Sequence, residues 1–171
     1  MAILLKKKLE VMNHLKSEVE FIEKLNEKKP HVKVGILNLM PTLEDTERQL
    51  MVALDTKLLQ VELDFLYLDT KIVEKEKKEY YKKYYRSFSE IKKEDYDGII
   101  ITGAPLEHIN YHDIDYIEEL KEFFKYTKQH VRSTLFLCWA SHFGLQYFYG
   151  VNRYNLPEKL SGIYEHYIVK E

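Results

Sequence analysis

Hydrophobic and polar positions alternate along this chain with two different periods, which predict helices and strands in turn. Residues 4–29 carry apolar side chains at nearly helical spacing with charged residues between them, and Pro30 ends the pattern. We expect one long helix there, which forms an N-terminal helical extension over residues 1–30. Residues 32–39 are mostly apolar and lie between Pro30 and Pro41, as is typical of a strand.

The remaining segments continue this alternation. The patterns predict helices over residues 42–55, 114–129 and 140–149, and strands over residues 58–68, 97–103 and 133–138. Strands that alternate with helices form parallel sheets covered by helices on both faces. We therefore expect a single α/β domain over residues 1–171, a three-layer sandwich with a mainly parallel sheet.

Residues 71–86 are crowded with Lys, Glu and Tyr. Aromatic residues interleaved with lysines can stack on RNA bases. The alternative is a solvated helix or loop in which acids and lysines balance. The net charge of −2 and the pI of about 6.4 favour the solvated segment and argue against a nucleic-acid partner.

The overall composition is that of a soluble globular protein, because 45% of the 171 residues are hydrophobic and 32% are charged. The longest apolar runs are too short to span a bilayer, and the lysines at positions 6–8 follow the apolar start, which is the reverse of a signal peptide. A single cysteine excludes an internal disulfide and fits a reducing compartment, so we expect a cytoplasmic protein without a membrane partner. No spacing of histidine, cysteine and acid suggests a metal site, and we expect no cofactor.

The one cysteine, Cys138, ends a predicted strand just where a predicted helix begins. A sharp turn there lifts a thiol out of the sheet, and the unpaired N–H groups at the helix start favour the reactive thiolate. The alternative is a small buried hydrophobic residue. Ligands of parallel sheets gather at the carboxyl ends of the strands, where residues 38–41, 102–107 and 138–139 meet. This convergence favours a functional thiol.

These segments carry a resemblance to a known family. The motifs at residues 38–42 with Glu47, 102–107, 133–140, 158–162 and 164–166 stand in the same order as in the homoserine O-acyltransferases, the family of homoserine O-succinyltransferase. The resemblance implies a class I glutamine amidotransferase-like (flavodoxin-like) fold, of which residues 31–171 are the nucleophile-bearing part. It also implies an activity in methionine biosynthesis and a homodimer.

The resemblance also implies the chemistry. Cys138 matches the family nucleophile, which takes an acyl group from acetyl-CoA or succinyl-CoA as a thioester and passes it to the hydroxyl of L-homoserine. By analogy with the nucleophile elbow, the Trp139 backbone N–H is a candidate donor to the oxyanion. Lys159 aligns with the family lysine that binds the amino-acid substrate, and its alternative is a surface lysine.

Glu107 matches the position that separates acyl donors in the family, where glycine goes with succinyl-CoA and glutamate with acetyl-CoA. A carboxylate in a small pocket repels the succinyl carboxylate and fills its space, so the resemblance implies an acetyltransferase. The alternative is a solvent-facing loop acid.

The chain departs from the family pattern in one respect. In the family, the catalytic histidine and glutamate lie further along the sequence than the position that matches Glu171. We therefore expect that this chain is truncated, that it relies on a partner chain, or that it has lost catalysis. His142 and His108 are the local candidates for a base. A serine O-acetyltransferase, a glutamine amidotransferase-like hydrolase and a catalytically silent binding domain stay open as alternatives.

Overall fold

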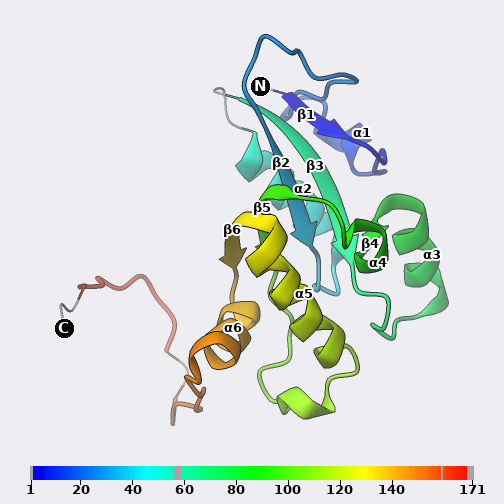
Figure 1. Ribbon diagram of the computed structural model, residues 1–171. Helices are drawn as coiled ribbons and strands as arrows, with labels where there is room; N and C mark the ends of the chain where they lie inside the picture. Colours follow the sequence, from blue (N-terminus) through cyan, green and yellow to red (C-terminus); the bar gives the residue numbers. More distant parts are fainter. Residues whose placement is uncertain (1, 56–58, 159, 169–171) are drawn as a thin grey trace.

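The computed structural model describes residues 2–55, 59–158 and 160–168, whose core is one parallel β-sheet (Figure 1). Its strands are β1 (Ala2–Leu5), β2 (His31–Leu37), β3 (Gln60–Tyr67), β4 (Arg86–Ser87), β5 (Tyr96–Ile101) and β6 (Val131–Phe136). The strand order is β1-β3-β2-β5-β6, and β4 pairs with β3. Every pairing between these strands is parallel, as the alternation of strands and helices predicts.

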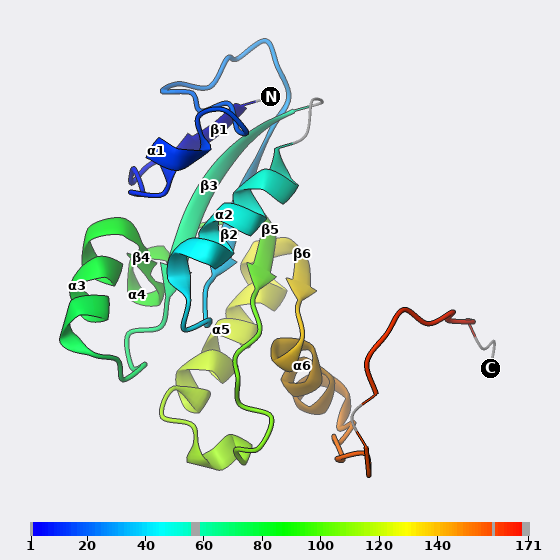
Figure 2. The ribbon, with the colours of Figure 1, turned by 180° about the vertical axis from the view of Figure 1, so that it is seen from behind.

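Helices cover both faces of this sheet. They are α1 (Met12–Leu15), α2 (Leu43–Leu54), α3 (Lys75–Tyr84), α4 (Phe88–Ile91), α5 (Ile117–His130) and α6 (Trp139–Tyr149), with a short 3-10 turn at Tyr111–Asp113. Figures 1 and 2 show α2 and α5 on opposite faces of the sheet. This arrangement confirms the predicted three-layer α/β sandwich.

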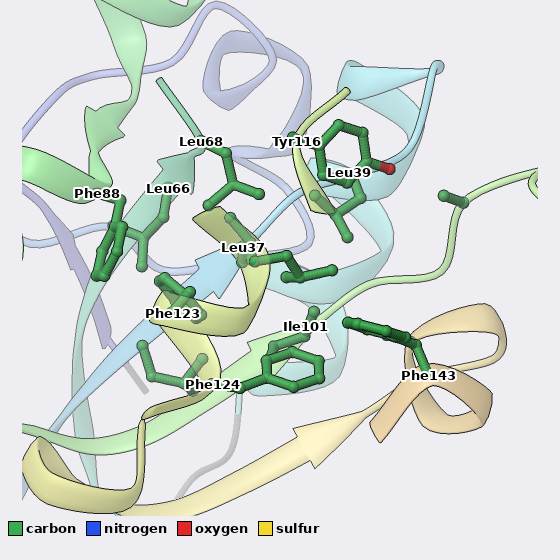
Figure 3. Close-up of a cluster of buried hydrophobic side chains, with 14 of the residues drawn as sticks. Leu37, Leu39, Leu66, Leu68, Phe88, Ile101, Tyr116, Phe123, Phe124 and Phe143 are labelled. Carbon is green, nitrogen blue, oxygen red and sulfur yellow. The ribbon is translucent and has the colours of Figure 1, made fainter. Parts of the chain in front are cut away.

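Two hydrophobic clusters fill the space between the layers. Figure 3 shows part of the first, in which Phe123 and Phe124 of α5 lie against Leu37 and Ile101 of the sheet. The second cluster joins α1, α2 and α3 to the other face. Successive strand residues point to opposite faces of the sheet, and helices cover both faces. Because β2 and β5 are covered on both sides, their sequences are mostly apolar without alternation.

The predicted long helix over residues 4–29 is wrong. Residues Ala2–Leu5 form β1, which pairs in parallel with β3, and the only helix of this region in the described residues is the single turn of α1. Many of its apolar side chains are buried, but in a segment that folds back so that Phe21 bridges to Ile3. Residues 2–5 therefore belong to the sheet and not to a helical extension.

The tyrosine-rich segment is helical, as one of the two readings of residues 71–86 predicts, but it is only partly solvated. Tyr81, Tyr84 and Tyr85 are buried in the second cluster, and the ring of Tyr81 stacks on Tyr67 with 5.1 Å between centroids. These rings are occupied by packing, which removes them from any surface that could stack on RNA bases.

The chain leaves the sandwich after α6. Gly150 ends α6 in the left-handed conformation, with φ of 69°, as its position after the last apolar residue predicts. The described residues from 151 onward form no regular helix or strand, and Figure 1 shows them running away from the sheet. None of the helices among the described residues has the length and apolar character that a bilayer crossing requires.

Candidate active site

Cys138 lies on a sharp turn between β6 and α6. Its backbone has φ of 51° and ψ of −120°, and it is the only residue other than glycine with positive φ in the described part of the chain. Such a conformation is rare for a residue with a side chain and is maintained only where the surroundings enforce it. The thiol is exposed, so the alternative of a buried hydrophobic cysteine is wrong. The local geometry is that of a nucleophile elbow.

Hydrogen bonds from the start of α6 hold this turn. The Ser141 N–H and the Ser141 hydroxyl both donate to the carbonyl oxygen of Cys138, at 2.9 and 2.6 Å. The Ala140 N–H donates to the Leu137 carbonyl at 3.1 Å. The Trp139 N–H, the first of the helix, donates to no group among the described residues, as expected for the first turn of a helix. This N–H is therefore free to donate to a developing oxyanion.

Gly103, just beyond the end of β5, forms one wall beside the thiol. A Cβ atom built on Gly103 would lie 3.0 Å from the Cβ of Cys138 and 3.4 Å from its Sγ. Few real Cβ atoms make contacts this close, so the absence of a side chain at position 103 is what lets the two backbones approach. The predicted meeting of residues 102–107 with residues 138–139 is thus confirmed at Gly103.

The end of β2 joins the same edge through Thr102. The Leu39 N–H donates to the Thr102 hydroxyl at 2.8 Å, and that hydroxyl donates to the Gly103 carbonyl at 3.1 Å. The Leu137 N–H in turn donates to the Ile101 carbonyl at 2.9 Å. The carboxyl ends of β2, β5 and β6 therefore lie side by side, as the parallel sheet predicts.

The other predicted site residues are placed less closely. Glu107 is exposed on the loop that begins at Gly103, four residues further along. Lys159 lies outside the described residues. The indole of Trp139 is buried and stacks on Phe143 with 5.7 Å between ring centroids. The candidate donor of Trp139 is therefore its backbone N–H and not its side chain. The structure thus brings Cys138, Trp139 and Gly103 together, and it leaves Glu107 exposed on the loop.

Neither local histidine forms a side-chain hydrogen bond with the thiol in the described part of the chain. His142 and His108 are both exposed, and no hydrogen bond among the described residues joins either imidazole to Cys138. Among the same residues no cluster of three His, Cys, Asp or Glu side chains could hold a metal ion. The described residues therefore provide an exposed thiol and a free N–H donor, without a base that is hydrogen-bonded to the thiol.

Two polar groups next to this edge were not identified from the sequence. Lys71 donates from Nζ to the Leu39 carbonyl at 2.8 Å, and burial lowers the pKa of its ammonium to about 8. Glu47 is completely buried on α2, and burial raises the pKa of its carboxyl. Glu47 belongs to a motif that carries the family resemblance, which was the available signal, whereas Lys71 lies in the segment interpreted as solvated.

A cysteine on a strained turn between a parallel strand and a helix, at the carboxyl edge of a three-layer α/β sandwich, defines the class of α/β proteins with a nucleophile elbow. The family profile of homoserine O-succinyltransferase matches residues 2–171, and the chain belongs to this family.

Two curated relatives carry the name homoserine O-acetyltransferase. The protein of Bacillus cereus is 38% identical over 169 residues, which are 99% of this chain and 54% of that protein. The protein of Thermotoga petrophila is 44% identical over 140 residues, which are 82% of this chain and 46% of that protein. The chain spans about half the length of the curated relatives it matches.

Proposed function

We propose that this chain is the nucleophile-bearing part of a homoserine O-acetyltransferase of methionine biosynthesis, with Cys138 as the residue that carries the acetyl group. The observation that carries the proposal is the strained, exposed Cys138 beside Gly103, in a chain of the homoserine O-succinyltransferase family. The names of the two relatives support acetyl over succinyl.

The first half-reaction is thioester exchange. The Cys138 thiolate attacks the carbonyl carbon of acetyl-CoA, the new S–C bond forms, and the bond to the CoA sulfur breaks when the tetrahedral intermediate collapses. The negative charge on the carbonyl oxygen of that intermediate is stabilised by the free Trp139 N–H at the start of α6.

The second half-reaction passes the acetyl group to L-homoserine. The hydroxyl oxygen attacks the thioester carbon, its proton goes to a base, and the S–C bond to Cys138 breaks. Lys159 is proposed to bind the substrate carboxylate, and Glu107 to exclude the carboxylate of a succinyl group. Since no hydrogen bond among the described residues joins His142 or His108 to the thiol, we assign the base to a group outside the described residues. We place the reaction in the cytoplasm, in a homodimer.

Labelling with radioactive acetyl-CoA tests the first half-reaction without requiring the second. We expect rapid, hydroxylamine-sensitive labelling of the wild-type chain and none of Cys138→Ser, which keeps the size of the side chain. Folded wild-type chain that takes up no label contradicts the proposal and favours a silent binding domain, and glutaminase activity points to an amidotransferase-like hydrolase. Chase of the label with L-homoserine or L-serine identifies the acceptor.

A further inference from the structure

Glu47 is a buried acid that the proposed acyl transfer does not use. It lies on α2 with none of its surface exposed, and its carboxylate accepts hydrogen bonds from two tyrosines. The Tyr85 hydroxyl donates to Oε1 at 2.7 Å, and the Tyr80 hydroxyl lies 3.0 Å from both oxygens. Burying a carboxylate is costly, so a buried carboxylate whose hydrogen-bond donors among the described residues are two hydroxyls needs a reason in the structure around it.

The hydrogen bonds continue from Glu47 to the end of β2. A carboxylate only accepts hydrogen bonds, so the Tyr85 proton is directed to Glu47 and the Tyr85 oxygen is left to accept. It accepts from the Asn38 side-chain amide at 2.9 Å, and Asn38 Oδ1 accepts from the Met40 N–H at 3.1 Å. The amide of Asn38 is therefore fixed in orientation, and with it the turn over residues 38–40.

This turn is in contact with the wall beside the thiol. The Leu39 N–H, between Asn38 and Met40, donates to the Thr102 hydroxyl, which donates to the Gly103 carbonyl. Gly103 is the residue whose missing side chain allows the close approach to Cys138. The buried acid on α2 is thus joined to the exposed thiol by hydrogen bonds, by the peptide bond between Asn38 and Leu39, and by the close approach of Gly103 to the Cys138 side chain.

We propose that Glu47 and Tyr85 are positioning residues that fix the Gly103 wall against Cys138 through Asn38 and Thr102. They touch neither the thiol nor a substrate. Their effect on acyl transfer rests on the proposed function, but their effect on the thiol itself does not. Displacement of a reacting group by about 1 Å can cost up to about a hundredfold in rate, so loosening this wall is expected to be measurable.

The matched variants are Tyr85→Phe and Tyr80→Phe. Each removes one hydroxyl donor from the same carboxylate, but only Tyr85 also contacts Asn38. The readout is the rate at which iodoacetamide alkylates Cys138 across a pH series, which needs neither acetyl-CoA nor a base. We expect the alkylation rate of Tyr85→Phe to differ from that of wild type by about tenfold or more at the low-pH or the high-pH end of the series. We expect the rate of Tyr80→Phe to stay within about twofold of wild type at every pH. Equal profiles in two folded variants overturn the inference.

A second pair covers the case in which Tyr85→Phe does not fold. Thr102→Val removes the hydroxyl that joins Leu39 to Gly103 while keeping the shape, and Thr102→Ser keeps the hydroxyl. We expect Thr102→Val to alter the pH profile of the alkylation rate and Thr102→Ser to keep the wild-type profile. An unaltered profile in folded Thr102→Val overturns the inference. Because alkylation is separate from acetyl labelling, a wild-type chain that takes no label refutes the proposed function and leaves this test intact.

Discussion

The backbone of Cys138 is held in a conformation that costs about 1–3 kcal/mol for a residue with a side chain. Two hydrogen bonds from Ser141 to the Cys138 carbonyl help to offset this cost, and the absence of a side chain at Gly103 leaves room for the Cys138 side chain. The strained turn places an exposed thiol at the start of a helix. The position of the thiol was predictable from the sequence, because a strand pattern stops and a helix pattern starts at the same residue.

Glu107→Gly tests the proposed choice of acyl donor. Like charges brought together cost several kcal/mol, so removing the carboxylate is expected to raise the preference for succinyl-CoA over acetyl-CoA by about tenfold or more. The measurement is the ratio of thioester formation at Cys138 from the two labelled donors. Glu107→Gln, which removes the charge and keeps the size, separates repulsion from lack of space. An unchanged ratio in both variants contradicts the assignment.

Lys71 gives the chain a pH-dependent stability. Its folded pKa is lowered from 10.5 to about 8 by burial. Between these values the unfolded chain binds more protons than the folded chain, so the contribution of Lys71 to the free energy of unfolding rises with pH. We expect the stability of wild type relative to Lys71→Met to increase between about pH 7 and pH 10 in urea unfolding. A difference that does not vary with pH contradicts the burial of this ammonium.

At the scale of elements, the sequence predicts the sandwich but not its first strand. β2, β3, β5 and β6 lie where the apolar patterns place them, because a strand covered on both faces has few polar residues. The segment before β2 has helical spacing, yet Ile3 and Leu5 pair with β3, since long-range strand pairing overrides a local pattern. The segment that contains α3 is predicted to be solvated because it is rich in lysine. Its sequence does not show that neighbouring elements bury Tyr81 and Tyr84.

The same limit applies to the site. Glu47 lies on α2, Tyr85 directly after α3 and Asn38 directly after β2, and only the folded chain shows that their side chains meet. Gly103 and Cys138, in contrast, were placed together from sequence, because the ends of adjacent parallel strands meet at one edge.

Gly103→Ala tests the contact between the loop after β5 and the turn after β6. The new methyl group would lie 3.0 Å from the Cys138 Cβ, so we expect a loss of about 1–3 kcal/mol in the free energy of unfolding and a changed alkylation rate. Gly98→Ala on β5 is the matched control, because its methyl group would meet no atom closer than 3.9 Å. Equal effects of the two variants on the alkylation of Cys138 argue against the contact.

At the scale of the whole molecule, the sheet of the described residues ends on one side at β6. Leu135 on this strand is 53% exposed, and Leu145 of the neighbouring α6 is exposed as well. A hollow of about 610 Å³ is lined by residues of β6 and α6, among them Val131, Phe136, Leu145 and Phe148, whereas Leu135 does not line it. Exposed leucines at the edge of a sheet favour association with another chain.

Leu135→Lys tests this expectation. A lysine on an edge strand opposes pairing with another strand. We therefore expect the wild-type chain to self-associate as its concentration rises and Leu135→Lys to do so less, as measured by sedimentation velocity. Lys128→Glu, which changes charge at the hollow without adding polarity to the strand, is the control. A monomeric wild-type chain at all concentrations contradicts the role given to this edge and the proposed homodimer.

Covalent labelling of Cys138 by radioactive acetyl-CoA is the most direct test of the account. The account predicts one acetyl group per chain, located on the peptide that contains Cys138, released by hydroxylamine and absent from Cys138→Ser. A folded chain with an iodoacetamide-reactive thiol that never acquires the acetyl group would contradict it.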